Sequence, residues 1–159
     1  MKKYILLFVF LILSSKYPSK DCCELIDYKE LRIQQIKNSD FSIELLKEYL
    51  KLTDSVKHDI PLRQFILETG WFSSELFLEY NNIAGMKFPK NRETTAIDDW
   101  NSHAVYSHWT ESVDDYILWR NNYISKGYDT TNYYKFLKSI GYAEDEKYEM
   151  RLKQIKINK

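Results

Sequence analysis

Cysteine is scarce in this sequence, and the two cysteines that it has are neighbours, Cys22 and Cys23. Adjacent cysteines do not reach ordinary disulfide geometry without strain, so we do not expect them to cross-link the fold. No further cysteine exists for a disulfide framework or a cysteine-based zinc site. Both lie far along the chain from the histidines, which disfavours a cysteine peptidase.

Histidine and the common ligand-binding motifs are also sparse. His58, His103 and His108 are scattered, and no two of them form an H-x-x-x-H pair. The sequence has no G-x-S-x-G elbow, no Walker loop and no dinucleotide-binding fingerprint. We therefore expect an activity that needs neither a metal nor a cofactor.

An excess charge of either sign is missing as well, because 23 basic residues balance 23 acidic ones. Without residues 1–15 the chain would lose Lys2 and Lys3 and no acid, which leaves 21 basic against 23 acidic residues, a net charge of −2. Such a balance creates no general attraction for nucleic acid. We expect no nucleic-acid partner.

One long apolar run stands at the start of the chain. A short basic "MKK" precedes ten mostly aliphatic and aromatic residues, Tyr4 to Leu13, and a polar stretch follows. This arrangement is typical of a secretory signal, and an uncleaved membrane anchor is the alternative. We expect an exported protein with a signal or anchor at 1–15, a linker and helical lead-in at 16–39, and one domain at 40–159.

Helical spacing of apolar residues dominates the rest of the sequence. Ser42, Asp59, Ser73 or Ser74, and Thr110 are predicted N-caps, and Gly141 is a predicted C-cap. Two short strands, 94–97 and 103–107, are predicted around a polar turn at 98–102. The predicted fold class is mainly α with a small β-hairpin lobe. We expect helices in the segments 23–37, 42–52, 59–69, 73–80, 110–124, 131–140 and 145–156.

Glu68 is the first candidate for chemistry. It lies at the edge of an apolar helix face, beside Phe65, directly before "TGW". Partial removal of water raises the pKa of a carboxyl group, so such a residue could hold a proton near neutral pH and give it to a glycosidic oxygen. The simpler alternative is a solvated helix residue.

Aromatic and amide side chains follow Glu68 along the sequence. Flat rings suit the apolar faces of sugars, although a place in the core is the alternative for each ring. Asn81 and Asn82 could bind an acetamido group or hold a loop. Lys87, Lys90 and Arg92 could meet an anionic glycan–peptide strand. The candidate rings are Trp71, Tyr80, Trp100, Tyr106 and Trp109.

Four segments between Ser42 and Ile155, in the same order, resemble the glucosaminidase domain of bacterial cell-wall hydrolases. "QFILETGWFSS" resembles the family's Q-x-x-L-E-[ST]-G, and "NNIAGMK" resembles N-N-L-F-G-[MI]-[KR]. "AVYSHWTESVDDYILW" resembles an aromatic-x-S-W-x-[ED]-S-x-x-D-Y region, and "IGYAEDEKYEMRLKQI" a closing Y-A-x-D-x-x-Y-x-x-K-[IL] helix. The chain looks most like short exported members from Bacteroidetes-type bacteria.

The resemblance implies a lysozyme-like helical fold and an endo-β-N-acetylglucosaminidase that acts on peptidoglycan. It implies that Glu68 is the catalytic acid and that Tyr142 lines the catalytic centre. No motif marks a second acid, and Glu93 is the candidate that we would test first. A close second carboxylate would imply retention of configuration and a distant one inversion. The acetamido group of the substrate could also act as the nucleophile.

The resulting prediction is a monomeric, exported peptidoglycan hydrolase that cleaves the β-1,4 bond after N-acetylglucosamine. The alternatives are a lytic transglycosylase on the same fold and a catalytically silent glycan-binding module. A wall amidase is disfavoured, because the sequence lacks a zinc or cysteine centre. The predicted substrate-binding residues are Trp71, Asn81, Asn82, Lys87, Tyr106 and Trp109.

Overall fold

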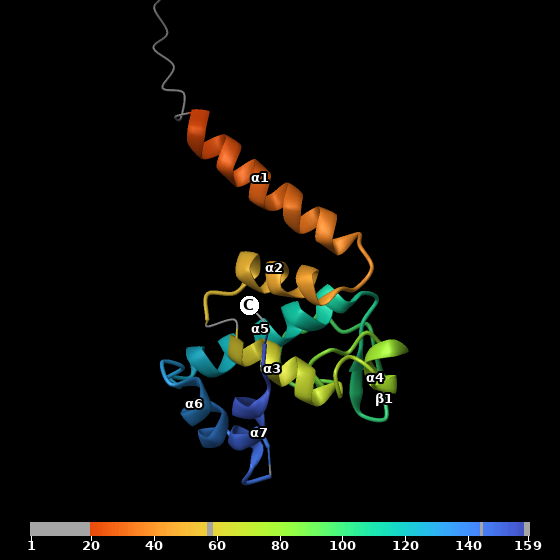
Figure 1. Cartoon of the computed structure of the whole chain (residues 1–159), viewed down its shortest axis with the longest axis vertical. Helices are drawn as coiled ribbons and strands as arrows, with labels where there is room; N and C mark the ends of the chain where they lie inside the picture. Colours follow the sequence, from red (N-terminus) through yellow and green to blue (C-terminus); the bar gives the residue numbers. More distant parts are fainter. Residues whose placement is uncertain (1–19, 57–58, 144, 158–159) are drawn as a thin grey trace, which may run out of the picture.

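The computed structural model describes residues 20–56, 59–143 and 145–157, with side chains from residue 28 onward (Figure 1). The predicted signal or anchor at 1–15 lies outside the described residues. In the described part of the chain, seven helices and one two-stranded antiparallel sheet follow one another, which confirms the predicted fold class. The elements are α1 (Lys20–Lys37), α2 (Ile43–Thr53), α3 (Asp59–Glu68), α4 (Glu75–Leu78), β1 (Asp98–Trp100), β2 (His103–Val105), α5 (Trp109–Ser125), α6 (Tyr133–Ser139) and α7 (Tyr148–Gln154).

The core lies around α5, with α3 packed against it. The rings of Phe65 on α3 and Tyr116 on α5 meet edge-on, with their centroids 5.0 Å apart, and both side chains are fully buried. Burial of apolar and aromatic surface of this kind is the main favourable contribution to folding. Helix α7 packs against α3, and Arg63 of α3 donates hydrogen bonds to the last carbonyl groups of α7. The C-terminal segment is thereby held beside the end of α3.

Helix α1 extends away from the rest of the domain (Figure 1). Its last turns contact α2 through Ile36, which is fully buried, and through a two-bonded ion pair between Arg32 and Glu48. Tyr28 and Leu31 are 70% and 55% exposed. Across residues 20–56, 59–143 and 145–157, none of the helices combines the length and apolar character that a membrane span requires.

The hairpin differs from the prediction in its first strand. Residues 94–97 were predicted to pair, but β1 begins at Asp98, inside the predicted turn. The N–H of Ile97 still donates to the carbonyl of Val105, whereas the Thr95 hydroxyl donates to the carbonyl of Glu111 and the Thr94 hydroxyl accepts from the N–H of Ala96. Asn101 and Ser102 have φ of +48° and +66°, so they form a tight two-residue turn that pairs Trp100 with His103.

The helix starts confirm part of the capping prediction. The side chains of Ser42 and Ser74 accept hydrogen bonds from the backbone N–H groups of Leu45 and Phe77, as N-caps do. The prediction of Thr110 as the cap of α5 is wrong. Helix α5 begins at Trp109, and the ring nitrogen of His108 takes the capping position instead.

Candidate active site

A hollow of about 680 Å³ opens between the end of α3, the segment after Asn82, and the segment that joins α6 to α7. Its walls come from four parts of the sequence that lie far apart along the chain. Aromatic side chains form much of its surface. The described lining consists of Leu67, Glu68, Gly85, Met86, Lys87, Phe88, Pro89, Arg92, Trp119, Tyr123, Ile140, Gly141, Tyr142, Ala143, Asp145, Tyr148 and Arg151.

Glu68 is the last residue of α3 and lines this hollow. The helix ends there because Gly70 adopts φ +55°, a left-handed conformation that glycine adopts without steric cost. Thr69 then holds the turn: its hydroxyl donates to the carbonyl of Phe65 and accepts from the N–H of Phe72. The end of the helix therefore fixes where the Glu68 carboxyl group stands.

The turn after Glu68 continues in the left-handed region for two further residues. Trp71 and Phe72 have φ of +63° and +61°, values that cost energy for side chains with a Cβ. Phe72 packs against Phe41 and Phe77, with centroids 4.8 and 5.9 Å away. Trp71 is 62% exposed and is not part of the hollow's described lining. Its predicted contact with substrate remains a prediction.

The segment 81–87 forms the wall opposite Glu68, and glycine is needed there for two reasons. Gly85 has φ +63°, and a Cβ added to it would lie 3.4 Å from Oε2 of Glu68. The backbone thus approaches the carboxyl group closely. The "NNIAGMK" stretch serves this approach, because it places a residue without a side chain beside the candidate acid.

The two asparagines of this segment hold the loop, which was the alternative to sugar binding. Asn82 is 1% exposed; its amide donates to the carbonyls of Met86 and Ala104, and its oxygen accepts from the N–H of Met86. Asn81 donates to the carbonyls of Tyr106 and Ser107. Neither side chain belongs to the described lining of the hollow.

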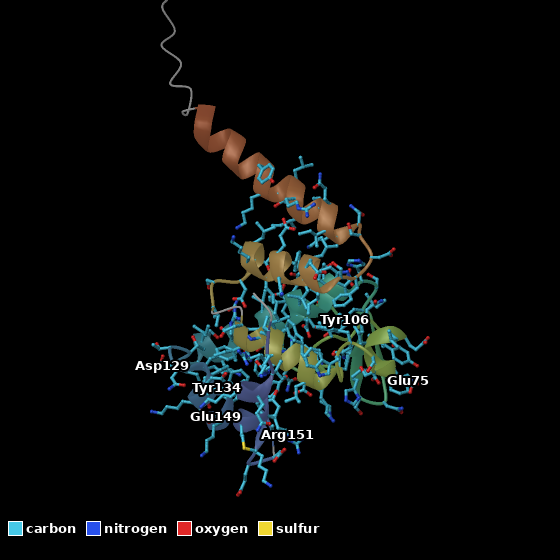
Figure 2. The ribbon with its side chains drawn as sticks, in the orientation of Figure 1. Glu75, Tyr106, Asp129, Tyr134, Glu149 and Arg151 are labelled. Atoms are coloured by element: carbon cyan, nitrogen blue, oxygen red, sulfur yellow. The ribbon has the colours of Figure 1, made fainter. Side chains whose placement is uncertain are left out.

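Two of the predicted sugar-binding rings lie in the core instead. Tyr106 and Trp109 are each 2% exposed, and Figure 2 places Tyr106 within the body of the molecule. The Tyr106 hydroxyl donates to Asp115 over 2.8 Å, and the Trp109 indole donates to the carbonyl of Ser39 over 3.3 Å. Their burial fits the core alternative. The rings that do line the hollow are Phe88, Trp119, Tyr123, Tyr142 and Tyr148.

Tyr142 lines the hollow beside Glu68, as the resemblance implied. Its hydroxyl lies 3.4 Å from the carbonyl oxygen of Ala84, and its ring packs edge-on against Trp119 at a centroid distance of 5.2 Å. Burial raises the pKa of Tyr142 well above the usual value, and the nearby Glu68 raises it further. Tyr142 is therefore a neutral phenol at every physiological pH.

Tyr148 is the functional candidate that the sequence did not indicate. It is the first residue of α7, and its hydroxyl donates to Oε1 of Glu68 over 2.7 Å. Tyr148 is the second tyrosine of the closing motif, but the motif assigned no role to it. Only the folded structure brings it to Glu68, because the two are separated by 80 residues.

The surroundings raise the pKa of Glu68 above its usual value. The protein around the carboxyl group removes water from it, which disfavours the ionised form, and the Tyr148 hydrogen bond lowers the pKa by a smaller amount. The carboxyl group still reaches solvent through the hollow. A protonated acid that remains open to a ligand is the condition that general acid catalysis requires.

The basic candidates are in different situations. Lys87 is exposed and lines the hollow. Arg92 also lines it, but its guanidinium group makes two hydrogen bonds, of 2.6 and 2.8 Å, to the buried carboxylate of Asp115. Lys90 is exposed and lies outside the described lining.

Glu93 lies outside the described lining of the hollow, with its side chain exposed to solvent. The carboxylates that the described lining contains are Glu68 and Asp145. Asp145 forms a 3.2 Å ion pair with Arg151 of α7, which Figure 2 shows at that end of the molecule together with Glu149. In the part of the chain with described side chains, no three His, Cys, Asp or Glu residues gather as a metal site would require.

The hollow brings a carboxyl group with a raised pKa to an open surface with aromatic walls, an arrangement that suits a glycan-cleaving enzyme. Comparison with protein families gives the same class, because the glucosaminidase family model, described as mannosyl-glycoprotein endo-β-N-acetylglucosaminidase, matches residues 44–158. The chain belongs to this family of glycoside hydrolases. Comparisons with curated proteins and with solved structures give no significant match.

Proposed function

We propose that this protein is an exported peptidoglycan hydrolase that cleaves the β-1,4 glycosidic bond after N-acetylglucosamine, with Glu68 as the general acid. The observation that carries the proposal is the state of Glu68. Its carboxyl group stands at an open hollow, has a raised pKa, and accepts a hydrogen bond from Tyr148 on one oxygen while the other lies beside Gly85.

The chemistry follows from this arrangement. Because the Tyr148 hydroxyl occupies Oε1, the acidic proton of Glu68 resides on Oε2. Transfer of this proton to the glycosidic oxygen breaks the bond to the anomeric carbon and leaves positive charge on the sugar ring. Water then completes hydrolysis, and its proton returns to a base.

Three groups are candidates for guiding that water or stabilising the positive charge. Asp145 shares the lining of the hollow with Glu68, and the neutral Tyr142 phenol can hydrogen-bond a water or a sugar hydroxyl. Glu93 is the third candidate, although it lies outside the described lining. The variants Asp145→Asn, Tyr142→Phe and Glu93→Gln, compared for their rates of glycan cleavage, show which of the three groups the reaction needs.

The walls suit a glycan strand. Phe88, Trp119 and Tyr123 offer ring surface for the apolar faces of sugar rings, and Lys87 adds a positive charge for the acidic groups of a wall polymer. The exposed Trp71 lies three residues beyond the acid and could extend the contact along the strand. No metal or cofactor takes part in the proposed reaction, and the enzyme acts as a monomer.

Mass spectrometry of purified cell-wall sacculi digested with the protein tests the proposal, with Glu68→Gln in parallel. Muropeptides that end in reducing N-acetylglucosamine, lost in the variant, are the expected result. Anhydro sugars would instead identify a lytic transglycosylase. Retained binding without any product from the unaltered protein would identify a glycan-binding module, and released peptides would identify an amidase.

A further inference from the structure

A continuous chain of hydrogen bonds leads from the candidate acid, at the open hollow, into the buried core. The Tyr148 hydroxyl donates to Oε1 of Glu68 over 2.7 Å, and its oxygen accepts a hydrogen bond from the amide nitrogen of Gln64 over 3.3 Å. Gln64 lies on α3, one helical turn before Glu68, and is fully buried. Its amide therefore reaches Glu68 through Tyr148.

The chain continues across the core from Gln64. The amide oxygen of Gln64 accepts a very short hydrogen bond from the hydroxyl of Tyr116 on α5. The hydroxyl oxygens of Tyr116 and Tyr133 lie 2.6 Å apart. Both rings are 3% exposed or less, so water does not compete for these bonds.

An ion pair closes the far end of the chain. The positive charge of Arg120 lies near the Tyr133 hydroxyl and opposes the rise in the pKa of Tyr133 that burial causes. The guanidinium group of Arg120 makes two hydrogen bonds of 2.6 Å to the carboxylate of Asp54, and these two side chains are 2% and 0% exposed. The pair is held between α5 and the residue that ends α2.

The chemistry of the groups sets the direction of every bond. The proton of Tyr116 is used in its bond to Gln64, so the Tyr116 oxygen accepts the proton of Tyr133. Tyr116 in turn gives its proton to the Gln64 oxygen, and the Gln64 amide donates to Tyr148, which leaves the Tyr148 proton for Glu68. Each donor in the series points toward the candidate acid.

We propose that Gln64 is a positioning residue that, with Tyr116 behind it, fixes the Tyr148 hydroxyl as a donor to Oε1 of Glu68 and so keeps the acidic proton on Oε2. The inference rests on the proposed role of Glu68. Bonds that point the same way polarise one another, so the series strengthens the last bond to the carboxyl group. A tyrosine without this support could turn its proton elsewhere.

Packing alone does not require such a series. Well-packed apolar side chains of similar size would fill the same space at equal or better stability, because each buried polar group must be compensated by a partner. In the part of the chain with described side chains, the series ends at the one carboxyl group that lines the hollow with a raised pKa. Because the series ends at Glu68, it differs from a hydrogen-bond network that only stabilises the core.

Other charged and titratable groups line the hollow with Glu68, and one of them, Tyr142, also interacts with Tyr148. Tyr142 lies beside Glu68, with its ring centroid 5.7 Å from that of Tyr148. Asp145 and Arg151 on the α7 side form their own ion pair, and Arg92 is paired with Asp115. Lys87 and Tyr123 complete the titratable lining. A change confined to Gln64 leaves all of these in place.

The test is a pH titration of the Glu68 carboxyl group, followed by NMR with ¹³C-labelled glutamate in the full chain. Glu68→Gln identifies the signal. We expect Gln64→Met and Tyr148→Phe each to move the Glu68 midpoint upward, because the bond that favours the ionised form is weakened or lost. Ile66→Val is the matched control, since Ile66 is a fully buried apolar residue of the same helix and carries no group of the series.

Cleavage kinetics on a soluble glycan give the second readout. Gln64→Met should lower kcat by about 10-fold or more, with KM nearly unchanged, because Gln64 orients the catalytic group and does not touch the substrate. The upper limb of the pH profile should move with the NMR midpoint. Tyr116→Phe removes a single hydroxyl group and should act in the same direction if Gln64→Met does not fold.

The outcomes separate the two claims. An unchanged Glu68 midpoint in both Gln64→Met and Tyr116→Phe, with a shift in Tyr148→Phe, would overturn the positioning role. A midpoint shift in Ile66→Val as large as that in Gln64→Met would overturn it too. Full activity of Glu68→Gln, with the midpoint shifts as expected, would refute the proposed function and leave the hydrogen-bond series standing.

Discussion

At the scale of single residues, the fold places the carboxyl group of Glu68 where its ionised form is disfavoured. A group whose folded pKa is raised above its unfolded value is destabilising when ionised. Glu68 therefore lowers the stability of the protein at pH values above its folded pKa, and this loss is absent below the unfolded pKa, where the group is protonated in both states.

We expect Glu68→Gln to raise the melting temperature at pH 7 and to leave it nearly unchanged near pH 3. Gln keeps the shape and can still accept the Tyr148 hydrogen bond, but it carries no charge to desolvate. Thermal unfolding at the two pH values measures the difference. Glu93→Gln is the control, because Glu93 is exposed; an equal gain there, or a gain that is larger at pH 3, would contradict the account.

Gly85 offers a second prediction at this scale. Gly85→Ala should lower stability by about 1–2 kcal/mol, because an Ala at φ +63° is strained, and it should also reduce cleavage, because the new methyl group crowds Oε2 of Glu68. Gly127→Ala is the matched control: φ is +87°, and nothing lies within 4 Å of the added Cβ. Comparable losses of activity in both variants would show that backbone strain alone is responsible.

The sequence marked Glu68 because a helix pattern, an acid and a Gly turn coincide within a few residues. It did not mark Tyr148 or the network behind Gln64, because these bonds join residues between 17 and 84 positions apart. A single sequence does not show which of its distant residues contact one another in the folded chain. The roles of Asn82 and Tyr106 stayed open for a related reason. The same residue types, amides and phenols, occur both in the core and in sugar-binding sites, so the sequence does not distinguish the two.

At the scale of secondary-structure elements, the apolar periodicity predicted the helices, and individual hydrogen bonds set the exact ends of some elements. The helices from α2 to α7 were expected from apolar spacing, and each lies within or close to its predicted range. The first strand begins later than predicted: before Asp98 the hydrogen bond from Ile97 to Val105 continues the pairing, and the Thr94 and Thr95 hydroxyl groups bond to Ala96 and Glu111. The cap of α5 was misplaced because a histidine ring accepts the bond that the serine–threonine preference assigns to a hydroxyl group.

The ion pair between Asp54 and Arg120 ties the end of α2 to α5, and its loss should be severe. We expect Asp54→Asn to lower the free energy of unfolding by about 3–5 kcal/mol, because it leaves a buried guanidinium group without its carboxylate. Urea denaturation measures this change. Glu149→Gln is the control, since its pair with Lys153 is exposed to solvent and should contribute little to stability. Equal losses would contradict the expected importance of burial.

At the scale of the whole molecule, α1 stands partly apart from the domain that the family match covers (Figure 1). Tyr28 and Leu31 of α1 are exposed, whereas Ile36 in its last turn is fully buried. A chain that begins at residue 28 keeps Ile36 and the ion pair between Arg32 and Glu48, and it is the reference for a shorter chain.

A chain that begins at residue 40 should lose about 2–5 kcal/mol of stability, because it lacks Ile36 and the ion pair between Arg32 and Glu48. It should nevertheless keep the hollow and its activity at low temperature. Calorimetry of the two shortened chains tests the expectation. Equal stability of both would show that α1 contributes nothing to the domain.

If Glu68 gives a proton to the leaving group, its importance must depend on how strongly the leaving group needs that proton. An aryl glycoside with a strongly acidic phenol departs without a proton, whereas a sugar alcohol does not. We predict that Glu68→Gln lowers the cleavage rate of a natural glycan by about 10²–10⁴-fold and that of the activated aryl glycoside by much less. An equal loss on both substrates would contradict a general acid role for Glu68.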